Sequence, residues 1–213
     1  MAAAPEKLAA LRHLLAERFP TVPRTAGRRL RTGVAAIDEA TGGLPLSAIT
    51  EIVCAAPSCG GYLLLAQLLT ITRAARQRVA LIDSTDAFDP ASLPEDLLTH
   101  LLWVRCAGTT QALQATDLLA RDANLSLVVL DLRRAPENEL RKIPGPQWYR
   151  LQRAIEPTDA VLVVETPRPA VPSAQVRFTL NTSHEAAALD HERTELATTL
   201  SASLQRQRLV AAG

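Results

Sequence analysis

The sequence is poor in cysteine and in aromatic residues. Its three cysteines, Cys54, Cys59 and Cys106, are an odd number without paired CxxC spacing, which argues against a disulfide framework and against a zinc site. Two of them lie in or beside apolar strand-like runs, where a free thiol behaves as a small hydrophobic group. We therefore predict structural cysteines and no metal site.

Charge of one sign is also lacking, and so are long apolar runs. The chain has 23 basic and 22 acidic residues, so its net charge of +1 does not indicate a nucleic-acid-binding protein. No apolar run reaches the roughly 20 residues that cross a bilayer. Glu6 and Arg12 stand where a signal peptide needs its apolar stretch. We expect a soluble, cytoplasmic protein without a membrane partner.

What the sequence does contain is an alternation of short apolar runs with helix-like segments. With 213 residues, 47% of them apolar, it is long enough for one core with short extensions. The alternation predicts an α/β fold with a mostly parallel sheet flanked by helices. The strands are expected at 48–54, 78–84, 101–106, 125–132, 159–167 and, at one edge of the sheet, 174–181.

Both ends of the chain have helical periodicity. Apolar residues recur every three or four positions in 6–19, and again from 185 onward, which predicts two amphipathic helices. The expected organisation is an N-terminal helix with a basic linker (1–30), a core (31–181) and a C-terminal helical tail (182–213).

The turn after the first core strand has the frame of a phosphate-binding loop. Aligned with that eight-residue motif, Ala55 replaces the first glycine and Gly60 keeps the last one. Gly61 replaces the lysine that reaches the β- and γ-phosphates, and Tyr62 replaces the Ser/Thr that binds Mg²⁺. Alone, this stretch fits an ordinary strand-to-helix turn as well as it fits a degenerate nucleotide site.

The neighbouring segments resemble the RecA-like superfamily. The stretch 31–52 is similar to the entry of the RecA core, 79–90 to its next strand, and 101–132 to the strand, helix and Walker B strand that follow. The resemblance covers about residues 6–180 and implies a RecA-like core.

The departures from the family pattern imply that the chemistry is lost. Thr85 stands where the family has the carboxylate that activates water, and Asp131 alone matches, as the Walker B carboxylate or as a structural cap of a buried strand. With lysine, hydroxyl and base all replaced, we expect no ATP hydrolysis, no Mg-ATP cofactor and no enzyme activity. The vestigial nucleotide site is predicted from Ala55, Gly60, Gly61, Tyr62, Thr85 and Asp131.

Two basic segments are candidates for contact with single-stranded DNA or with an acidic partner. The segment 133–153 stands where RecA-like proteins carry their first DNA-binding loop, and it mixes basic residues with Trp148 and Tyr149. The alternatives are a solvated helical loop whose tryptophan packs on the core and, for the N-terminal cluster, a charged linker. The candidate contacts are Arg28, Arg29, Arg31, Arg141, Lys142, Trp148 and Arg150.

Two bacterial families share this fold without a working phosphate loop. One is ImuA, an accessory protein of error-prone translesion DNA synthesis in the SOS response, which works with the polymerase homologue ImuB. The other is the cell-division inhibitor SulA, which binds FtsZ. The entry segment and the length favour ImuA, which implies a non-catalytic adaptor that binds an ImuB-like or RecA-like partner. A SulA-like inhibitor and a RecA paralogue with residual nucleotide or DNA binding remain as alternatives.

The two terminal helices are the candidate partner surfaces. Each would dock through its apolar face in a groove of the partner, or else would pack back on its own core. The oligomeric state is left open. The residues of these faces are Leu8, Leu11, Leu15, Leu196, Leu200 and Leu204.

Overall fold

The computed structural model describes residues 27–208. The predicted N-terminal helix with Leu8, Leu11 and Leu15 lies outside the described residues. Within 27–208, none of the helices combines the length and the apolar character needed to cross a membrane.

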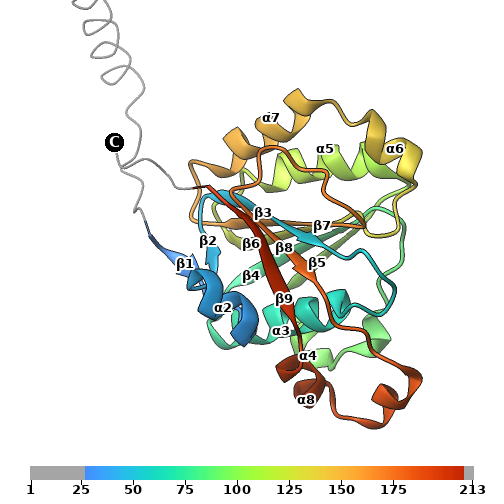
Figure 1. Cartoon of the computed structure of the whole chain (residues 1–213). Helices are drawn as coiled ribbons and strands as arrows, with labels where there is room; N and C mark the ends of the chain where they lie inside the picture. The colour runs from blue at the N-terminus through green and yellow to red at the C-terminus, as the bar shows by residue number, and fades with distance from the viewer. Residues whose placement is uncertain (1–26, 209–213) are drawn as a thin grey trace, which may run out of the picture.

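A seven-stranded sheet forms the middle layer, in the order β5-β4-β6-β7-β3-β8-β9 (Figure 1). All neighbouring strands are parallel except β8 and β9, so the prediction of a mostly parallel sheet is confirmed. The strands are β3 (Ala48–Val53), β4 (Arg78–Asp83), β5 (Leu101–Arg105), β6 (Leu125–Asp131), β7 (Val161–Thr166), β8 (Val176–Leu180) and β9 (Ala202–Gln207). A small antiparallel pair, β1 (Arg29–Leu30) with β2 (Leu44–Pro45), precedes the sheet.

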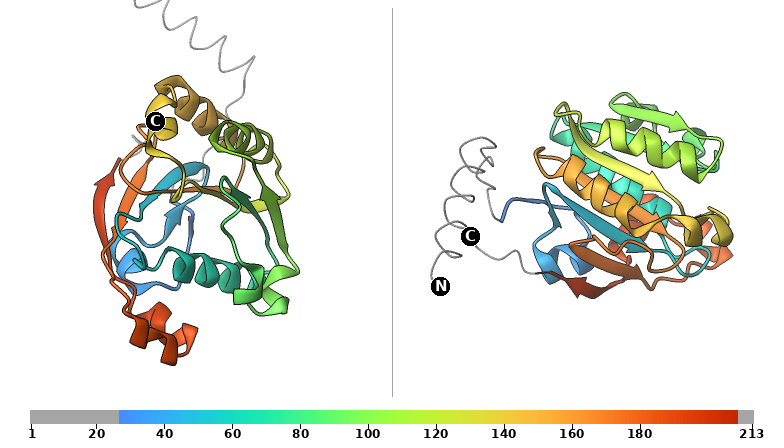
Figure 2. Two further views of the ribbon diagram at one scale, coloured as in Figure 1. Left: turned by 90° about the vertical axis from the view of Figure 1, so that its right-hand side faces the viewer. Right: turned by 90° about the horizontal axis from the view of Figure 1, so that it is seen from above.

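Helices cover both faces of this sheet (Figures 1 and 2). One face carries α2 (Ala35–Thr41), α3 (Gly61–Ala74) and α4 (Glu95–Leu98). The opposite face carries α5 (Thr109–Leu119), α6 (Glu137–Lys142) and α7 (Gly145–Ile155). Further along the chain, η2 (Ala186–Asp190) and α8 (Arg193–Thr198) lie at the end of α3, at the lower edge of Figure 1.

The core divides into two apolar layers because successive strand residues point to opposite faces. In β7, Val161 and Val163 pack on the α3 side, whereas Leu162 and Val164 pack on the α5 side. The central strands are apolar on both faces, as strands buried under two helical layers must be.

The C-terminal helical tail was predicted wrongly. The segment from 185 onward forms two short helical turns, η2 and α8, and then the strand β9, which pairs antiparallel with β8. Strand β8, predicted at the edge, is therefore an inner strand. The helical spacing of Leu196, Leu200 and Leu204 did not predict this, because an open strand edge supplies backbone partners that outweigh a weak local helical preference.

Candidate functional site

The turn between β3 and α3 lies at the carboxyl edge of the sheet, where ligands of open α/β proteins bind. It runs from Cys54 to Gly60, and α3 begins at Gly61. Gly60 has a φ of 95°, a left-handed conformation that a side chain would strain. The predicted strand, turn and helix are thus present, and their glycine is required by the backbone.

Two carboxylates stand beside this turn. Asp131 ends β6, and it is aligned with Glu165 on the neighbouring strand β7. Because side chains alternate along a strand, both have the same parity as the residues that pack on the α3 side. Asp131 is 5% exposed and Glu165 1% exposed, so both are withdrawn from water.

Arg133 supplies the positive charge for this pair. Its Nη2 lies 2.6 Å from Asp131 Oδ2, and its Nε donates to Asp131 Oδ1 at 3.0 Å. The same Nε is 2.9 Å from Glu165 Oε2, but its single hydrogen points to Asp131, so the contact with Glu165 is electrostatic rather than a hydrogen bond. The Arg133 side chain is only 11% exposed.

The Arg133 guanidinium also fills the space in front of α3. A Cβ atom added at Gly61 would lie 2.5 Å from Arg133 Nη1 and 3.1 Å from Cys54 Sγ. The guanidinium carbon is 3.9 Å from the centre of the Tyr62 ring, a close cation–π contact. The position of the missing lysine therefore has no room for a side chain, because an arginine from another strand end occupies it.

Burial sets the protonation of Glu165. Loss of hydration raises the pKa of Glu165 from 4.5 to about 8, against the attraction of Arg133, and the neighbouring charge of Asp131 adds to the rise. Burial by itself would lower the pKa of Arg133, but Glu165 and Asp131 outweigh it and raise that pKa. Near neutral pH, the cluster is therefore an Arg133–Asp131 ion pair beside a mostly protonated Glu165.

The sulfur atom of Cys59 lies at the start of α3. The Cys59 thiol interacts with the Cys54 side chain and with the backbone of Gly61 and of Cys59 itself, contacts that favour its thiolate. In a working phosphate loop, such N–H groups at a helix N-terminus bind phosphate. Here, the backbone N–H groups of Gly61 and Cys59 are directed at the Cys59 side chain instead.

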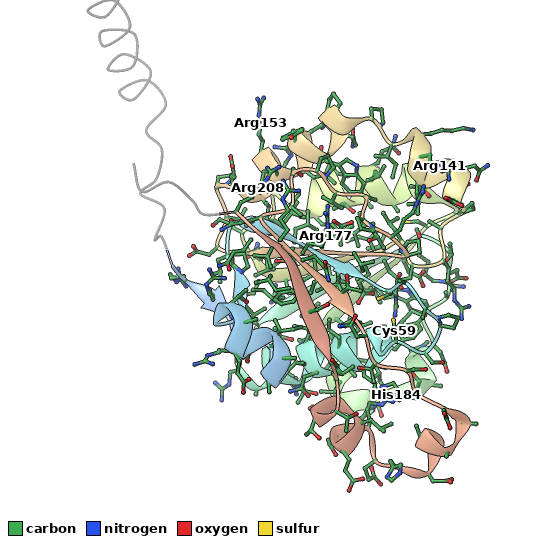
Figure 3. All side chains as sticks on the ribbon, in the orientation of Figure 1. Cys59, Arg141, Arg153, Arg177, His184 and Arg208 are labelled. Carbon is green, nitrogen blue, oxygen red and sulfur yellow. The ribbon has the colours of Figure 1, made fainter. Side chains whose placement is uncertain are left out.

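The segment after β8 covers the other side of the turn. The backbone N–H of His184 donates to Ser58 O at 3.2 Å, and a Cβ at Gly60 would fall on Leu200 Cδ2. Figure 3 shows Cys59 and His184 near the same end of the molecule. Between the turn, Arg133 and the segment 184–197 lies a hollow of about 1570 Å³, lined largely by apolar and small residues.

The loop after β4 is held by a buried carboxylate rather than poised for catalysis. Asp83 ends the strand and accepts the backbone N–H groups of Thr85, Ala87 and Phe88. Thr85 is exposed in this loop. Asp86 pairs with Arg105 through a bidentate contact of 2.5 and 2.6 Å, and this Arg105 contact holds the pKa of Asp86 below its usual range.

The predicted basic contacts are not gathered on one surface. Arg28 pairs with Asp159 at 2.8 Å, before β7, and Arg29 donates to Gly43 O. Arg141, by contrast, lies on α6, beyond the opposite end of the strands, as its label in Figure 3 shows. Arg31 and Lys142 are exposed.

Of the two alternatives for Trp148, stacking on DNA or packing on the core, the structure shows the second. Trp148 is 2% exposed and packs in the α5-side core, because its position on α7 faces the sheet. Its neighbour Tyr149 is 48% exposed. Arg150 pairs with Asp117 on α5 at 2.7 Å, so it holds two helices together.

Sequence reasoning missed Arg133 and Glu165 as parts of the site. Arg133 was counted with the candidate DNA-binding segment, although it stands two residues after the Walker B-like Asp131. Glu165 could have been noticed in the sequence, because it is the single acidic residue in the strand-like run 161–166 and follows four apolar residues. A charge in such a strand needs a buried partner of opposite sign.

Comparison with known proteins supports the fold alone. The chain is similar to the RadB recombinase in its crystal structure, with a TM-score of 0.63 and 16% sequence identity over 84% of this chain and 90% of that chain. In all, 351 chains of solved structures match, so the architecture is widely shared and does not by itself specify an activity. No protein-family model and no curated protein matches the sequence. The predicted RecA-like fold is confirmed.

Proposed function

We propose that this protein is a RecA-fold pseudo-ATPase that acts as a non-catalytic adaptor. The observation that carries the proposal is the Arg133 guanidinium in the space where a phosphate-loop lysine side chain would extend from position 61. A triphosphate would have to displace Arg133 from Asp131, leaving the Asp131 carboxylate unpaired and facing the incoming negative charge. The charge of Asp131 at the end of β6 is thus neutralised by Arg133 of the same chain, whose guanidinium also lies at the start of α3.

We place the adaptor in error-prone translesion DNA synthesis of the SOS response. This rests on the RecA-like entry segment, the RecA-like strand in 79–90, the C-terminal extension and the length of the chain, which favour an ImuA-like over a SulA-like protein. A relation to DNA recombination and repair fits the description of RadB as a recombinase. The partners would be an ImuB-like polymerase homologue and a RecA-like protein. No nucleotide cofactor is needed for this role.

The adaptor role is tested by binding measurements on the full chain. Immobilised protein should retain a purified ImuB-like protein and a RecA protein, without ATP and unchanged by its addition. Retention of neither would contradict the proposal. FtsZ supplies the comparison, because inhibition of its sedimentable polymer by this protein would support a SulA-like inhibitor instead.

The proposed loss of ATP hydrolysis is tested by restoring the lysine and the hydroxyl group of a phosphate-binding loop. In the double variant Gly61→Lys with Tyr62→Thr, we expect no ATP turnover, because Thr85 leaves no base and the new lysine competes with Arg133 for the same space. Adding Arg133→Ala to the same chain separates the two causes. Robust turnover from the double variant alone would contradict the account.

Direct DNA binding is the remaining alternative. Because Trp148 is buried, stacking would rest on the exposed Tyr149, with Arg141 and Lys142 as phosphate contacts. Salt-dependent binding of single-stranded DNA that is lost in Tyr149→Ala would support it. The adaptor proposal predicts no such binding by the isolated protein.

A further inference from the structure

The two ends of the β3–α3 turn carry cysteines whose thiols interact directly. Cys54 follows the last residue of β3, and Cys59 stands two residues before α3 begins. Four residues separate them in the sequence, but both line the same hollow, and Cys54 Sγ lies 3.1 Å from a Cβ atom added at Gly61, two residues after Cys59. The turn thus brings the two side chains into hydrogen-bonding contact. Both thiols are free.

Their surroundings differ from those of the third cysteine. Cys54 and Cys59 line the hollow beside Arg133, so a small solute can reach them although they are only 8% and 4% exposed. Cys106 follows β5, packs in the α5-side core and does not line that hollow. The chain therefore contains an internal control of comparable burial.

From this geometry we infer that Cys54 and Cys59 form a redox-active dithiol that hydrogen peroxide converts into an intramolecular disulfide, which a thiol reductant reopens. The site is independent of the proposed adaptor role. It uses the turn that would have held a phosphate group in a nucleotide-binding relative of this fold.

The surroundings of the two thiols shift their pKa values in opposite directions and so give them different roles. Contact with Cys54, the backbone N–H groups at the start of α3 and the charge of Arg133 lower the pKa of Cys59 from 9.0 to about 6. The interaction with Cys59 and burial raise the pKa of Cys54. Cys59 is thus the attacking thiolate, and Cys54 the resolving thiol.

The reaction balances with one peroxide. The Cys59 thiolate attacks one peroxide oxygen, an S–O bond forms, the O–O bond breaks, and hydroxide leaves and takes a proton to become water. Cys54 then attacks the sulfenic sulfur, an S–S bond forms, the S–O bond breaks, and the second water carries away the Cys54 proton. The two thiols supply two electrons, and peroxide is reduced to two waters.

Peptide mass spectrometry tests the site, after peroxide treatment of the folded full-length protein and alkylation in denaturant. Trypsin leaves both cysteines in the single peptide 32–73 and Cys106 in another. We expect the first peptide to lose two hydrogens and to resist alkylation until dithiothreitol is added, whereas Cys106 is alkylated throughout. Full alkylation of Cys54 and Cys59 after peroxide, or a bond to Cys106 or to a second chain, would overturn the inference.

Variants and pH distinguish the roles. Cys54→Ser should stop at a sulfenic acid on Cys59 that dimedone traps, whereas Cys59→Ser should give neither sulfenic acid nor disulfide. In the untreated protein, iodoacetamide should modify Cys59 with a midpoint near pH 6 and at least about tenfold faster than Cys106 at pH 7. In denaturant the two rates should become equal. Equal rates in the folded protein would overturn the assignment.

Discussion

At the scale of single residues, the decisive feature is that Arg133 takes over the charge that a lysine would have provided. It lies among Asp131, Glu165, Tyr62 and Gly61, which come from the ends of two strands and from the start of α3. A cation that is paired internally neutralises the site, whereas a phosphate-loop lysine stays available to its ligand. The glycine at position 61 and the arginine at position 133 therefore belong together, because the guanidinium fills the space that a side chain at 61 would need.

Removing Arg133 should destabilise the fold strongly. The substitution Arg133→Met leaves the buried Asp131 carboxylate without its ion-pair partner, and breaking such a pair costs about 3–5 kcal/mol. Urea denaturation should show this loss in the free energy of unfolding. The matched control is the exposed neighbour, because Arg134→Met should change stability by less than about 0.5 kcal/mol.

The raised pKa of Glu165 predicts a pH dependence. Between its unfolded value of 4.5 and its folded value of about 8, the folded chain holds a proton that the unfolded chain has released. Stability therefore falls as pH rises through this window, by at most about 1.4 kcal/mol per pH unit from this group. Below 4.5 the contribution is constant.

The variant Glu165→Gln isolates this effect. Its stability relative to the wild type should increase from pH 5 to pH 8, as measured by urea denaturation at a series of pH values. A difference that stays constant over the window would show that Glu165 ionises normally in the folded protein.

At the scale of elements, the C-terminal segment packs against the β3–α3 turn and does not form the predicted partner-binding helix. Leu200 is 4% exposed and packs over Gly60, whereas Leu204 on β9 is 37% exposed. Strand β9 at the same time closes the edge of β8. Of the three predicted partner residues in this tail, Leu200 is thus unavailable to a partner.

Two alanine variants compare these leucines. Leu200→Ala should cost about 2–5 kcal/mol, the usual range for a buried leucine, because it leaves a cavity over the turn. Leu204→Ala should cost less than about 1 kcal/mol, since its side chain is partly in water. Thermal or urea denaturation checks both, and equal losses would contradict the packing described for this segment.

The central strands could be predicted from the sequence, and β9 could not. Runs such as 125–132 and 159–167 are apolar on both faces, and that pattern follows directly from burial between two helical layers. The segment 202–207 reads ASLQRQ, which has few apolar residues, and its structure depends on pairing with β8, more than 20 residues earlier in the chain. Local sequence carries little of that information.

The strand-to-helix turn of the candidate site could be predicted from the sequence, but the arginine that lies in it could not. Ala55, Gly60, Gly61 and Tyr62 do form the predicted strand-to-helix turn, and Asp131 does end the predicted strand. The position of Arg133 depends on the side-chain direction after a strand end, which spacing alone does not determine. The meeting of Cys54 and Cys59 likewise follows from the fold of the turn.

At the scale of the whole molecule, we propose that the RecA-like fold is retained without its nucleotide chemistry. A two-faced core and a closed C-terminal edge hold the sheet together within residues 27–208. Interaction with partners then rests on surfaces outside the old nucleotide site. The N-terminal apolar face predicted from the sequence is the first candidate.

A charge-bearing variant of that face should separate binding from folding. With Leu8→Asp, Leu11→Asp and Leu15→Asp together in the full chain, retention of the RecA-like partner should be lost, because helix-in-groove docking depends on apolar anchors. The melting temperature of the variant should match that of the wild type. Retention at the wild-type level would exclude this face as the docking surface.

The most direct test of the central claim is a calorimetric titration of the full-length protein with Mg-ATP. The account predicts no heat of binding, because Arg133 is committed to Asp131 and Glu165 and stands in the place of the lysine side chain. Saturable binding in the micromolar range that Asp131→Ala abolishes would contradict it.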